Sequence, residues 1–257
     1  MCRALTQWPQ HFSITHRRVD LLQGEHDFLA ASEVLDEVVH ALAEQGIISK
    51  YLGEIYPVTG ASREQQYALL DRGAAAYFGI RTYGQHLNGY VKTDEGLKIW
   101  IARRAPDRIV FPNRLDNMVA GGLPQNLSLE QNLLKECQEE AGMPEYLVKR
   151  AIATGAVSYC CETDTGLKPD TLYCYDVELP ESFIPQNTDG EVAEFQLMDV
   201  QSVIELVRDS DEFKTNCNLV LLDFFIRHGM INPDQPGYLE LVSGLHPSGF
   251  QTHGDEW

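Results

Sequence analysis

In the first third of the chain, apolar residues recur at intervals of three and four positions, which is the period of a helix buried along one face. This spacing predicts a helix over residues 29–48, with Ser32 as its N-cap and Gly46 as its stop signal. The apolar positions on the buried side are Leu35, Val38, Val39 and Leu42.

A second helix is predicted from Ser62 to Ala76, because Ser62 and Gln65 form a capping-box pattern. Residues 54–60 (EIYPVTG) are short and interrupted by proline, so they are expected to form a strand or a turn. With two helices predicted, residues 1–80 are interpreted as an α-rich N-terminal domain.

From Tyr77 onward the apolar residues alternate with polar ones or form short runs, which is typical of strands. Strands are predicted at 86–92, 97–103, 116–120, 152–160, 171–178 and 194–198, and the residues TDEG at 93–96 predict a hairpin between the first two. Helices are expected at 128–141, 199–208 and 217–228. The pattern therefore predicts a mixed-sheet α/β domain over residues 81–245, followed by a tail over residues 246–257 that is expected to fray.

Composition narrows the classes of partner. The 257-residue chain is 44% hydrophobic, but 38 Asp and Glu residues against 20 Lys and Arg residues give a formal net charge of −18. That charge argues against nucleic acid or an anionic membrane as a partner. A polyanionic substrate would need a local basic pocket or bound divalent cations. No run of about 18 apolar residues is present, so no membrane span is predicted.

The cysteines and the start of the chain indicate a compartment. Six cysteines are scattered without a CxxC pair, and MCRALTQWPQHF lacks the apolar core of a signal peptide. They are interpreted as reduced thiols of a cytoplasmic protein. The sequence leaves open whether the N-terminal domain shapes a substrate pocket, mediates formation of a homodimer, or does both.

Three glutamates crowd together near the end of the helix predicted over 128–141. Glu136, Glu139 and Glu140 stand at positions i, i+3 and i+4, so their carboxylates share one side, along the edge of the apolar stripe. Solvent or a cation must absorb their repulsion. Oxygen ligands so arranged suit Mg²⁺, with Mn²⁺ as a second candidate, whereas most charge clusters on helices are solvated faces.

Local signals specify both ends of this helix. Ser128 and Gln131 form a capping box, and Gly142 followed by Pro144 is a stop signal. The positions of the three glutamates along the helix are therefore well defined by the sequence.

Two glycines, Gly121 and Gly122, precede the helix and are predicted to form a tight turn and to let backbone approach a ligand closely. The segment from Gly121 to Met143 resembles the Nudix box, whose pattern is Gly, five residues, Glu, seven residues, then Arg-Glu-apolar-x-Glu-Glu-x-Gly-apolar. Lys135 stands at the Arg position, and Leu127 stands where the family has its early Glu. The residues that match in kind are Glu136, Cys137, Glu139, Glu140, Gly142 and Met143.

This resemblance implies a Nudix fold, a mixed β-sheet sandwiched between helices, here with the α-rich N-terminal extension. It implies that water cleaves a small-molecule diphosphate while Glu136, Glu139 and Glu140 hold Mg²⁺ or Mn²⁺. Glu139, Glu140 or the later Glu191 would take the proton of the attacking water, and the choice among them stays open. Glu191 lies in DGEVAEF at 189–195, which also resembles the family.

Further segments, at residues 81–91, 100–105 (WIARRA), 111–124 and 213–229, are similar to the Nudix subgroup related to thiamine pyrophosphokinase. The subgroup implies hydrolysis of thiamine diphosphate analogues, oxidised or otherwise damaged, to the monophosphate. One alternative is another nucleoside or sugar diphosphate as the substrate. A second is a non-catalytic Nudix-fold binding module, in which Leu127 and Lys135 mark lost catalysis.

Several basic and acidic residues before the box are candidates for substrate contacts. Arg103 and Arg104 end a predicted strand on opposite faces, so one can reach the phosphates while the other meets water. A surface role for either is an equal alternative. Arg114 and Asp116 precede the glycines, and the resemblance marks their loop as near the substrate, although a structural turn is equally compatible.

His86 and Asn88 are the candidates for recognition of a pyrimidine ring. They share one face of a predicted strand, where both side chains can hydrogen-bond a heterocycle. A single histidine in a strand is more often structural, so both interpretations are kept.

Overall fold

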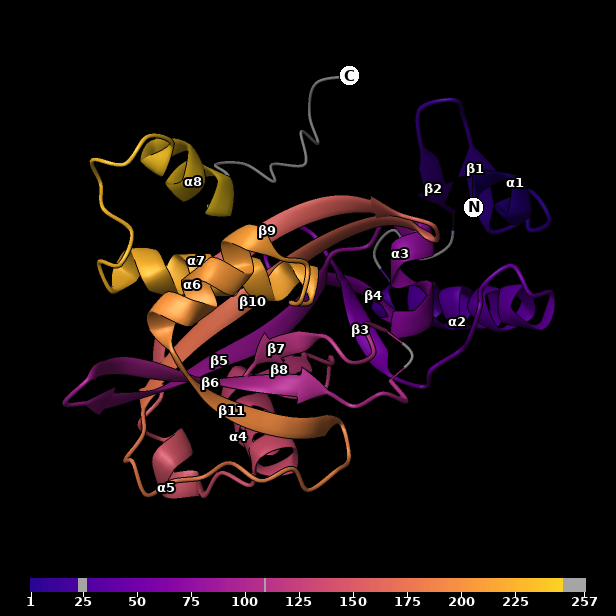
Figure 1. The fold of residues 1–257 in the computed structure, drawn as a ribbon. Helices are drawn as coiled ribbons and strands as arrows, with labels where there is room; N and C mark the ends of the chain where they lie inside the picture. Colours follow the sequence, from indigo (N-terminus) through magenta and orange to yellow (C-terminus); the bar gives the residue numbers. More distant parts are fainter. Residues whose placement is uncertain (23–26, 109, 247–257) are drawn as a thin grey trace.

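The computed structural model describes residues 1–22, 27–108 and 110–246. An N-terminal unit with small sheets lies beside a larger α/β unit built on one long twisted sheet (Figure 1). The two units face each other across strands β3, β5 and β8, which places the N-terminal unit next to the glycines that precede the glutamate helix.

The N-terminal unit packs around helix α2 (Phe28–Glu44). Val38, Val39 and Leu42 on that helix are fully buried, so the apolar face predicted from the spacing is confirmed. The other elements are α1 (Cys2–Leu5), β1 (Phe12–Ile14), β2 (Val19–Leu21), β3 (Ile55–Thr59), β4 (Gln66–Asp71), η1 (Arg72–Ala74) and α3 (Ala75–Phe78).

The start of α2 differs from the prediction. Asp27 is the N-cap, and its side chain accepts hydrogen bonds from the backbone amides of Leu29 and Ala30. Ser32, the predicted cap, lies inside the helix, where its hydroxyl donates to the carbonyl of Phe28 and accepts from the amide of Leu69. Ser32 therefore ties α2 to β4, and a side chain earlier in the chain caps the helix.

The helix predicted from Ser62 to Ala76 is wrong. Residues 66–71 form strand β4, which pairs antiparallel with β3, and only short helical turns follow. Within β4, Ala68 and Leu70 are buried, whereas Tyr67 before them is exposed and Leu69 between them is half-buried, so the segment has the alternation of a strand. Pairing with β3 outweighs a short capping pattern, and the N-terminal unit is mixed rather than α-rich.

The larger unit is built on a seven-stranded mixed sheet of order β11-β6-β5-β10-β9, with β7 on β6 and β8 on β5. The strands are β5 (Thr82–Thr93), β6 (Gly96–Arg104), β7 (Leu115–Asn117), β8 (Val119–Gly122), β9 (Ile152–Thr163), β10 (Gly166–Glu178) and β11 (Val192–Asp199). β10 runs parallel to β5, and the other pairs are antiparallel. The hairpin predicted at 93–96 is confirmed, whereas the strand predicted at 116–120 is divided into β7 and β8.

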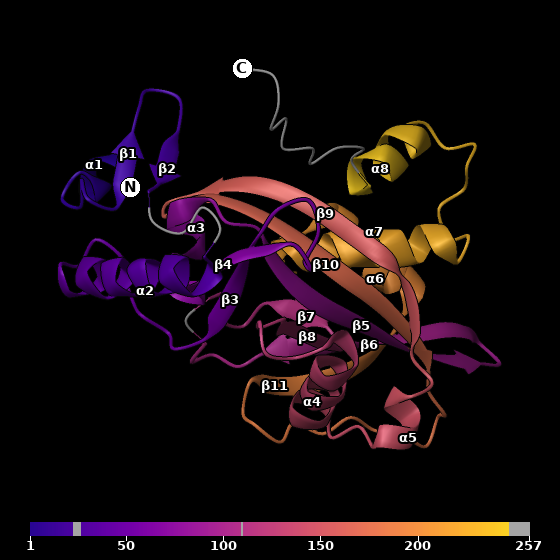
Figure 2. The ribbon, with the colours of Figure 1, turned by 180° about the vertical axis from the view of Figure 1, so that it is seen from behind.

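Helices cover both faces of this sheet (Figures 1 and 2). Helix α4 (Leu129–Ala141) and the short α5 (Glu145–Val148) pack on one face. Helices α6 (Val200–Asp209) and α7 (Thr215–Arg227) pack on the other, and α8 (Tyr238–Leu245) lies against α7. The predicted mixed sheet sandwiched between helices is confirmed.

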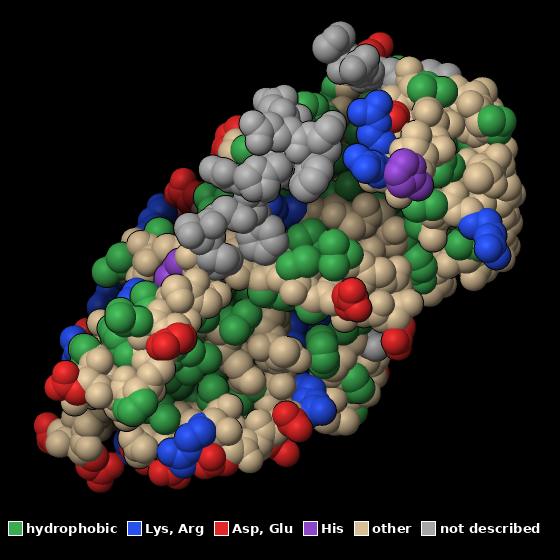
Figure 3. Space-filling view, turned by 90° about the horizontal axis from the view of Figure 1, so that it is seen from above, with side chains coloured by type: hydrophobic (Ala, Val, Ile, Leu, Met, Phe, Trp, Pro, Cys, Tyr) green, Lys and Arg blue, Asp and Glu red, His purple; other side chains and the backbone are tan. Residues whose placement is uncertain are grey.

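Of the predicted tail, only His246 belongs to the described residues, and residues 247–257 lie outside them. On the face shown in Figure 3, Asp and Glu side chains line much of the margin, with Lys and Arg lying singly among them. Within residues 1–22, 27–108 and 110–246, no helix is long and apolar enough to cross a membrane.

Two substitutions on helix α2 test how much the core of the N-terminal unit contributes to stability. Leu42→Ala should lower the free energy of unfolding by about 2–5 kcal/mol, because it removes a fully buried side chain. Leu29→Ala, on the same helix but exposed, is the matched control and should change it by less than about 0.5 kcal/mol. Urea unfolding measures both, and equal effects would contradict the assignment of the core.

Candidate active site

Helix α4 holds the glutamates in a defined frame. Its N-terminus carries the predicted capping box, with Ser128 accepting from the Gln131 amide while the Gln131 side chain accepts from the Ser128 amide. At its C-terminus, Gly142 adopts a left-handed conformation with φ of 59°, as a helix stop requires. Both predicted helix ends are confirmed.

The two glycines before α4 are strand residues. Gly121 and Gly122 end β8 and pair with β5, so the predicted tight turn is wrong. Neither residue has a positive φ. Side chains of the protein itself press against them: a Cβ on Gly121 would lie 2.7 Å from Oε2 of Glu136, and one on Gly122 would collide with the hydroxyl of Tyr56. Glycine is needed at both positions for close approach.

The three glutamates occupy different environments. Glu140 is 6% exposed, and its Oε2 accepts a hydrogen bond of 2.8 Å from the backbone amide of Ala120 on β8. The Glu136 side chain is 15% exposed, and that of Glu139 is 47% exposed. The ammonium of Lys135 lies 3.2 Å from Glu136 and 2.8 Å from Glu139. Glu140 and Glu136 therefore form the buried part of the cluster.

Burial makes the negative charge on this cluster costly. Burial, together with the carboxylates of Glu136, Asp116 and Glu191, raises the pKa of Glu140 to about 8 against the opposing hydrogen bond from the amide of Ala120. The pKa of Glu136 is also raised, chiefly by burial, with Lys135 opposing the shift. A cation placed between the carboxylates would relieve both effects.

Glu191 lies beside these carboxylates. It is among the charges that raise the pKa values of Glu136 and Glu140, and its carboxylate pairs with Arg108 at 2.9 Å. The structure therefore brings a residue that lies about 50 positions later in the sequence to the helix glutamates, next to strand β11.

The donor set fits Mg²⁺ or Mn²⁺. Glu136, Glu140 and Glu191 offer the hard oxygen atoms that such an ion prefers, but among the described residues they do not form a group with all ligand atoms within 4.8 Å of one another. A closer group is formed by His86, Asp116 and Cys217, whose ligand atoms lie within 4.8 Å of one another. That group is a poor cation site, because the ammonium of Lys214 and the guanidinium of Arg104 already bond Asp116.

Asp116 is a buried anchor. Its carboxylate pairs with Arg104 at 3.2 Å and Lys214 at 3.3 Å, and it accepts from the thiol of Cys217 at 2.7 Å. Burial alone would raise the pKa of Asp116, but Lys214 and the other donors outweigh it and lower the pKa. These bonds favour the structural interpretation of Asp116 over a substrate contact.

His86 and Asn88 are fully enclosed, on the sheet face that α7 covers. The Nδ1 of His86 lies 2.7 Å from Oδ1 of Asn117, and the amide of Asn117 donates to Asn88 at 2.8 Å. Asn88 in turn donates to Asp176 at 3.1 Å. The structure brings the two candidates together through Asn117, in a network that leaves neither exposed to a ligand.

The two arginines at the end of β6 hold a strained loop. Phe111 and Asn113 have positive φ values of 53° and 61°, which is costly for Phe in particular. Arg104 donates to the carbonyl of Phe111 at 3.2 Å, and Arg103 donates to that of Asn113 at 2.9 Å. Within the described chain, the guanidinium of Arg114 forms no hydrogen bond or ion pair, so it stays available.

Arg103 faces away from the helix carboxylates. Its ion-pair partners are Glu194 at 3.0 Å and Glu212 at 3.7 Å, both outside the α4 cluster. The surface interpretation therefore fits Arg103 better than a phosphate contact.

Residues that the sequence reasoning missed come from the N-terminal unit. Tyr56 on β3 touches Gly122, and the guanidinium of Arg72 lies 5.7 Å from the Tyr56 ring centre. Arg72 also pairs with Glu54 at 2.7 Å. No local motif marks these residues, because only the docking of β3 and β4 brings them to β8.

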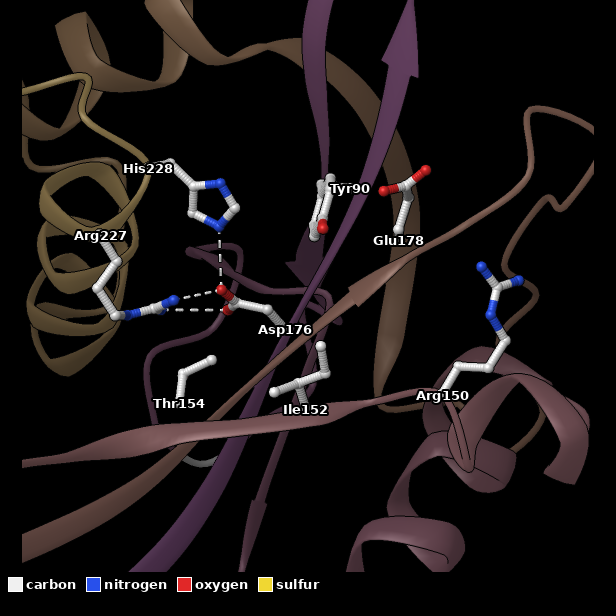
Figure 4. A pocket seen from close by; sticks show the side chains of 8 residues that line it. All are labelled: Tyr90, Arg150, Ile152, Thr154, Asp176, Glu178, Arg227 and His228. Carbon is white, nitrogen blue, oxygen red and sulfur yellow. Dashed lines mark hydrogen bonds and ion pairs between the residues drawn. The ribbon is translucent and has the colours of Figure 1, made fainter.

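A cavity of about 410 Å³ lies elsewhere, at the far ends of β5 and β10 (Figure 4). Inside it, Asp176 pairs with Arg227 and with His228, the latter at 3.1 Å, while Glu178 pairs with Lys92 at 2.6 Å. These carboxylates are neutralised within the protein. The network ties β10 to α7 and is separate from the helix glutamates.

Comparison with known proteins agrees with this geometry. Residues 89–217 match the family described as the NUDIX domain, and residues 1–82 match a domain of unknown function, DUF4743. The chain is 46% identical over 209 residues to Nudix hydrolase 20, chloroplastic, of Arabidopsis thaliana, covering 81% of this chain and 56% of that protein.

Two further relatives extend the likeness. Nudix hydrolase 24, chloroplastic, of Arabidopsis thaliana is 45% identical, with 81% of this chain and 57% of that protein covered. An uncharacterized protein of Saccharomyces cerevisiae is 35% identical over 253 residues, covering 91% of this chain and 73% of that protein. The chain spans a little over half the length of the two Arabidopsis proteins.

The buried His86 generates a prediction about pH. Burial, helped by Lys214, lowers the pKa of His86 to about 4, so the folded state keeps it neutral while the unfolded state protonates near pH 6.5. Its contribution to stability is present above pH 6.5 and is lost as the pH falls towards 4. In His86→Asn, which keeps a donor for Asn117, the free energy of unfolding should fall less steeply over that range, by up to about 1.4 kcal/mol per pH unit.

Urea unfolding at several pH values measures this slope, with His40→Asn on the exposed side of α2 as the control. Parallel curves for wild type and His86→Asn would show that His86 takes up its proton without penalty.

Proposed function

Because this chain belongs to the Nudix family, we propose that it is a Mg²⁺-dependent diphosphatase that converts thiamine diphosphate analogues, oxidised or otherwise damaged, to the monophosphate and phosphate. The observation that carries the diphosphatase chemistry is the buried pair Glu136 and Glu140. Their carboxylates press on β8 at Gly121 and Ala120, and Glu140 has no ion-pair partner among the described residues.

The chain supplies the groups that such a hydrolysis requires. When bound, Mg²⁺ neutralises the diphosphate and lowers the pKa of a water molecule. Glu136 and Glu140 would hold the ion, with Glu139 next to them on the solvent side. The water oxygen bonds to phosphorus, the bridging P–O bond breaks, and a carboxylate takes the proton. Glu191, which Arg108 holds beside the cluster, is a candidate for that base together with Glu139 and Glu140.

The choice of substrate rests on the resemblance to the subgroup related to thiamine pyrophosphokinase. Three of its segments, 81–91, 111–124 and 213–229, meet in the fold around Asp116, which bonds Lys214 and Cys217 and lies close to His86. This meeting point is an enclosed structural network, so the choice of substrate rests on the resemblance alone.

Two alternative functions each agree with a specific feature of the chain. Another nucleoside or sugar diphosphate would use the same carboxylates. A non-catalytic binding module is favoured by Leu127 and Lys135, the two departures from the Nudix box. The carbonyl of Leu127 accepts from Arg63 of the N-terminal unit at 3.0 Å, so this position serves the contact between the units.

We also propose a cytoplasmic location, on the basis of the cysteines. All six, at positions 2, 137, 160, 161, 174 and 217, are free thiols. Reduced thiols persist in the cytoplasm. The names of the two Arabidopsis relatives include the word chloroplastic, which describes those proteins.

A hydrolysis screen tests the function directly. With Mg²⁺, the protein should hydrolyse oxidised thiamine diphosphate analogues, measured by formation of the monophosphate product, with a higher kcat/KM than thiamine diphosphate, nucleoside diphosphates or sugar nucleotides. Chelation of the metal should abolish turnover. Preference for a nucleotide would replace the substrate, and absence of turnover with every diphosphate would favour the binding module.

Glu140→Gln tests the role of the buried carboxylate. Changes around a metal ligand typically cost about 10- to 100-fold in affinity or activity, so loss of the ligand itself should lower kcat/KM by at least about 100-fold. Removal of a buried charge should leave the melting temperature without Mg²⁺ unchanged or higher. Glu145→Gln, in a surface pair with Lys149, is the control and should keep full activity. Full activity of Glu140→Gln would refute the metal site.

A further inference from the structure

The N-terminal unit reaches the strand that carries the glutamate site. Tyr56 packs so closely on Gly122 that any side chain at position 122 would collide with its hydroxyl. Nη1 of Arg72 lies 3.4 Å from the place where that side chain would begin. The amide of Gln125, just after β8, donates to the carbonyl of Ile55 at 2.9 Å. β3 and the end of β8 therefore form one continuous packed edge.

The backbone beneath Arg72 is held by a buried acid. Asp71 is almost completely enclosed and accepts from the amides of Gly53 at 2.7 Å and Gly73 at 2.8 Å. The amide of Arg72 itself donates to the carbonyl of Glu54 at 2.8 Å. These bonds aim the guanidinium at a defined position, where its geometry is pre-organised.

Arg72 is a cation of the N-terminal unit that lies at the end of β8, with its Nη1 next to the Cβ position of Gly122. Its side chain is 48% exposed, and its ion-pair partner is Glu54. Burial lowers the pKa of Arg72, but Tyr56, Glu54 and also Glu191 outweigh burial and raise it. The carboxylate of Glu136 is likewise among the charges that raise the pKa of Tyr56. Both residues of the N-terminal unit thus lie within electrostatic reach of the site.

A diphosphate bound at the carboxylates needs positive charge besides the metal. The nearby cations are mostly engaged: Lys135 bonds Glu136 and Glu139, and Arg108 bonds Glu191. The Arg72 side chain is half-exposed and pairs with one carboxylate. Part of its guanidinium can therefore turn towards phosphate oxygens, which a guanidinium bonds in a bidentate manner.

We propose that the N-terminal unit completes the active site, with Arg72 binding non-bridging oxygens of the substrate diphosphate. Glu54 and the ring of Tyr56 hold the guanidinium when no substrate is bound, and the absence of a side chain at Gly122 leaves room for the Tyr56 hydroxyl beside it. This assignment rests on the proposed diphosphatase function and makes Arg72 a substrate-binding residue from outside the Nudix domain.

Steady-state kinetics of Arg72→Gln test the assignment. Loss of a charge-assisted bond should raise KM for the diphosphate by about 10- to 100-fold, with kcat changed much less and the Mg²⁺ activation constant unchanged. Arg72→Lys should recover part of the loss, because it restores charge without the fork. Arg18→Gln, which breaks the exposed pair of Arg18 with Asp20 in the same unit, is the matched control and should leave KM unchanged.

Glu54→Gln separates substrate binding from a purely structural ion pair. It removes the carboxylate that competes for the guanidinium, so KM should fall or stay the same. A merely structural Arg72–Glu54 pair would make Arg72→Gln and Glu54→Gln raise KM together. Melting temperatures of all variants, expected within a few degrees of wild type, control for unfolding.

Titration calorimetry with methylenediphosphonate and Mg²⁺, a probe that cannot be hydrolysed at its bridge, keeps the two proposals distinct. If the wild type turns over diphosphates and Arg72→Gln leaves KM and the Kd of the probe within twofold, the role of Arg72 is overturned and the function stands. If the wild type binds the probe without hydrolysing any diphosphate, and Arg72→Gln weakens binding, the function fails while Arg72 keeps its role. If the wild type neither binds nor hydrolyses, both are overturned.

Discussion

The contact between α4 and β8 is the constraint on which the site depends. Glu140 is held in the interior by the amide of Ala120, and Glu136 lies against Gly121 with only a glycine hydrogen between them. Burial raises the pKa of both carboxylates, and the charges of Glu136 and Glu191 add to the shift at Glu140, so a divalent cation would relieve an unfavourable concentration of negative charge. The chemistry of the site follows from this arrangement.

The same strand also joins the two units of the chain. Gly121 makes room for a glutamate of α4, whereas Gly122 makes room for Tyr56 of β3. Adjacent residues in a strand point to opposite faces, so one short strand receives the glutamate helix α4 at Gly121 and the N-terminal unit at Gly122. The two glycines thus make room for two different side chains, and neither forms the tight turn that the sequence predicts.

The structure encloses some of the residues that the sequence predicts for substrate binding, because the fold covers the sheet face on which they lie. His86, Asn88 and Asp116 are polar residues in strands, and their spacing shows which residues share a face but not what covers that face. In the fold α7 covers it, so His86 and Asn88 bond Asn117 and Asp116 pairs with Lys214 in enclosed surroundings. The guanidinium of Arg103 likewise donates a hydrogen bond to the carbonyl of Asn113 and forms an ion pair with Glu194.

The sequence by itself determined the features that depend on interactions between residues close to one another in the chain. The ends of α4, the hairpin after β5, helices α4, α6 and α7 and the spacing of the glutamates are predictable, because each depends on residues a few positions apart. Tertiary structure decided the rest. Strand β4 replaces a predicted helix because β3 pairs with it, and Arg72 meets Gly122 because two units dock. The contact between Arg72 and Gly122 joins residues 50 positions apart, and no short-range pattern in the chain encodes it.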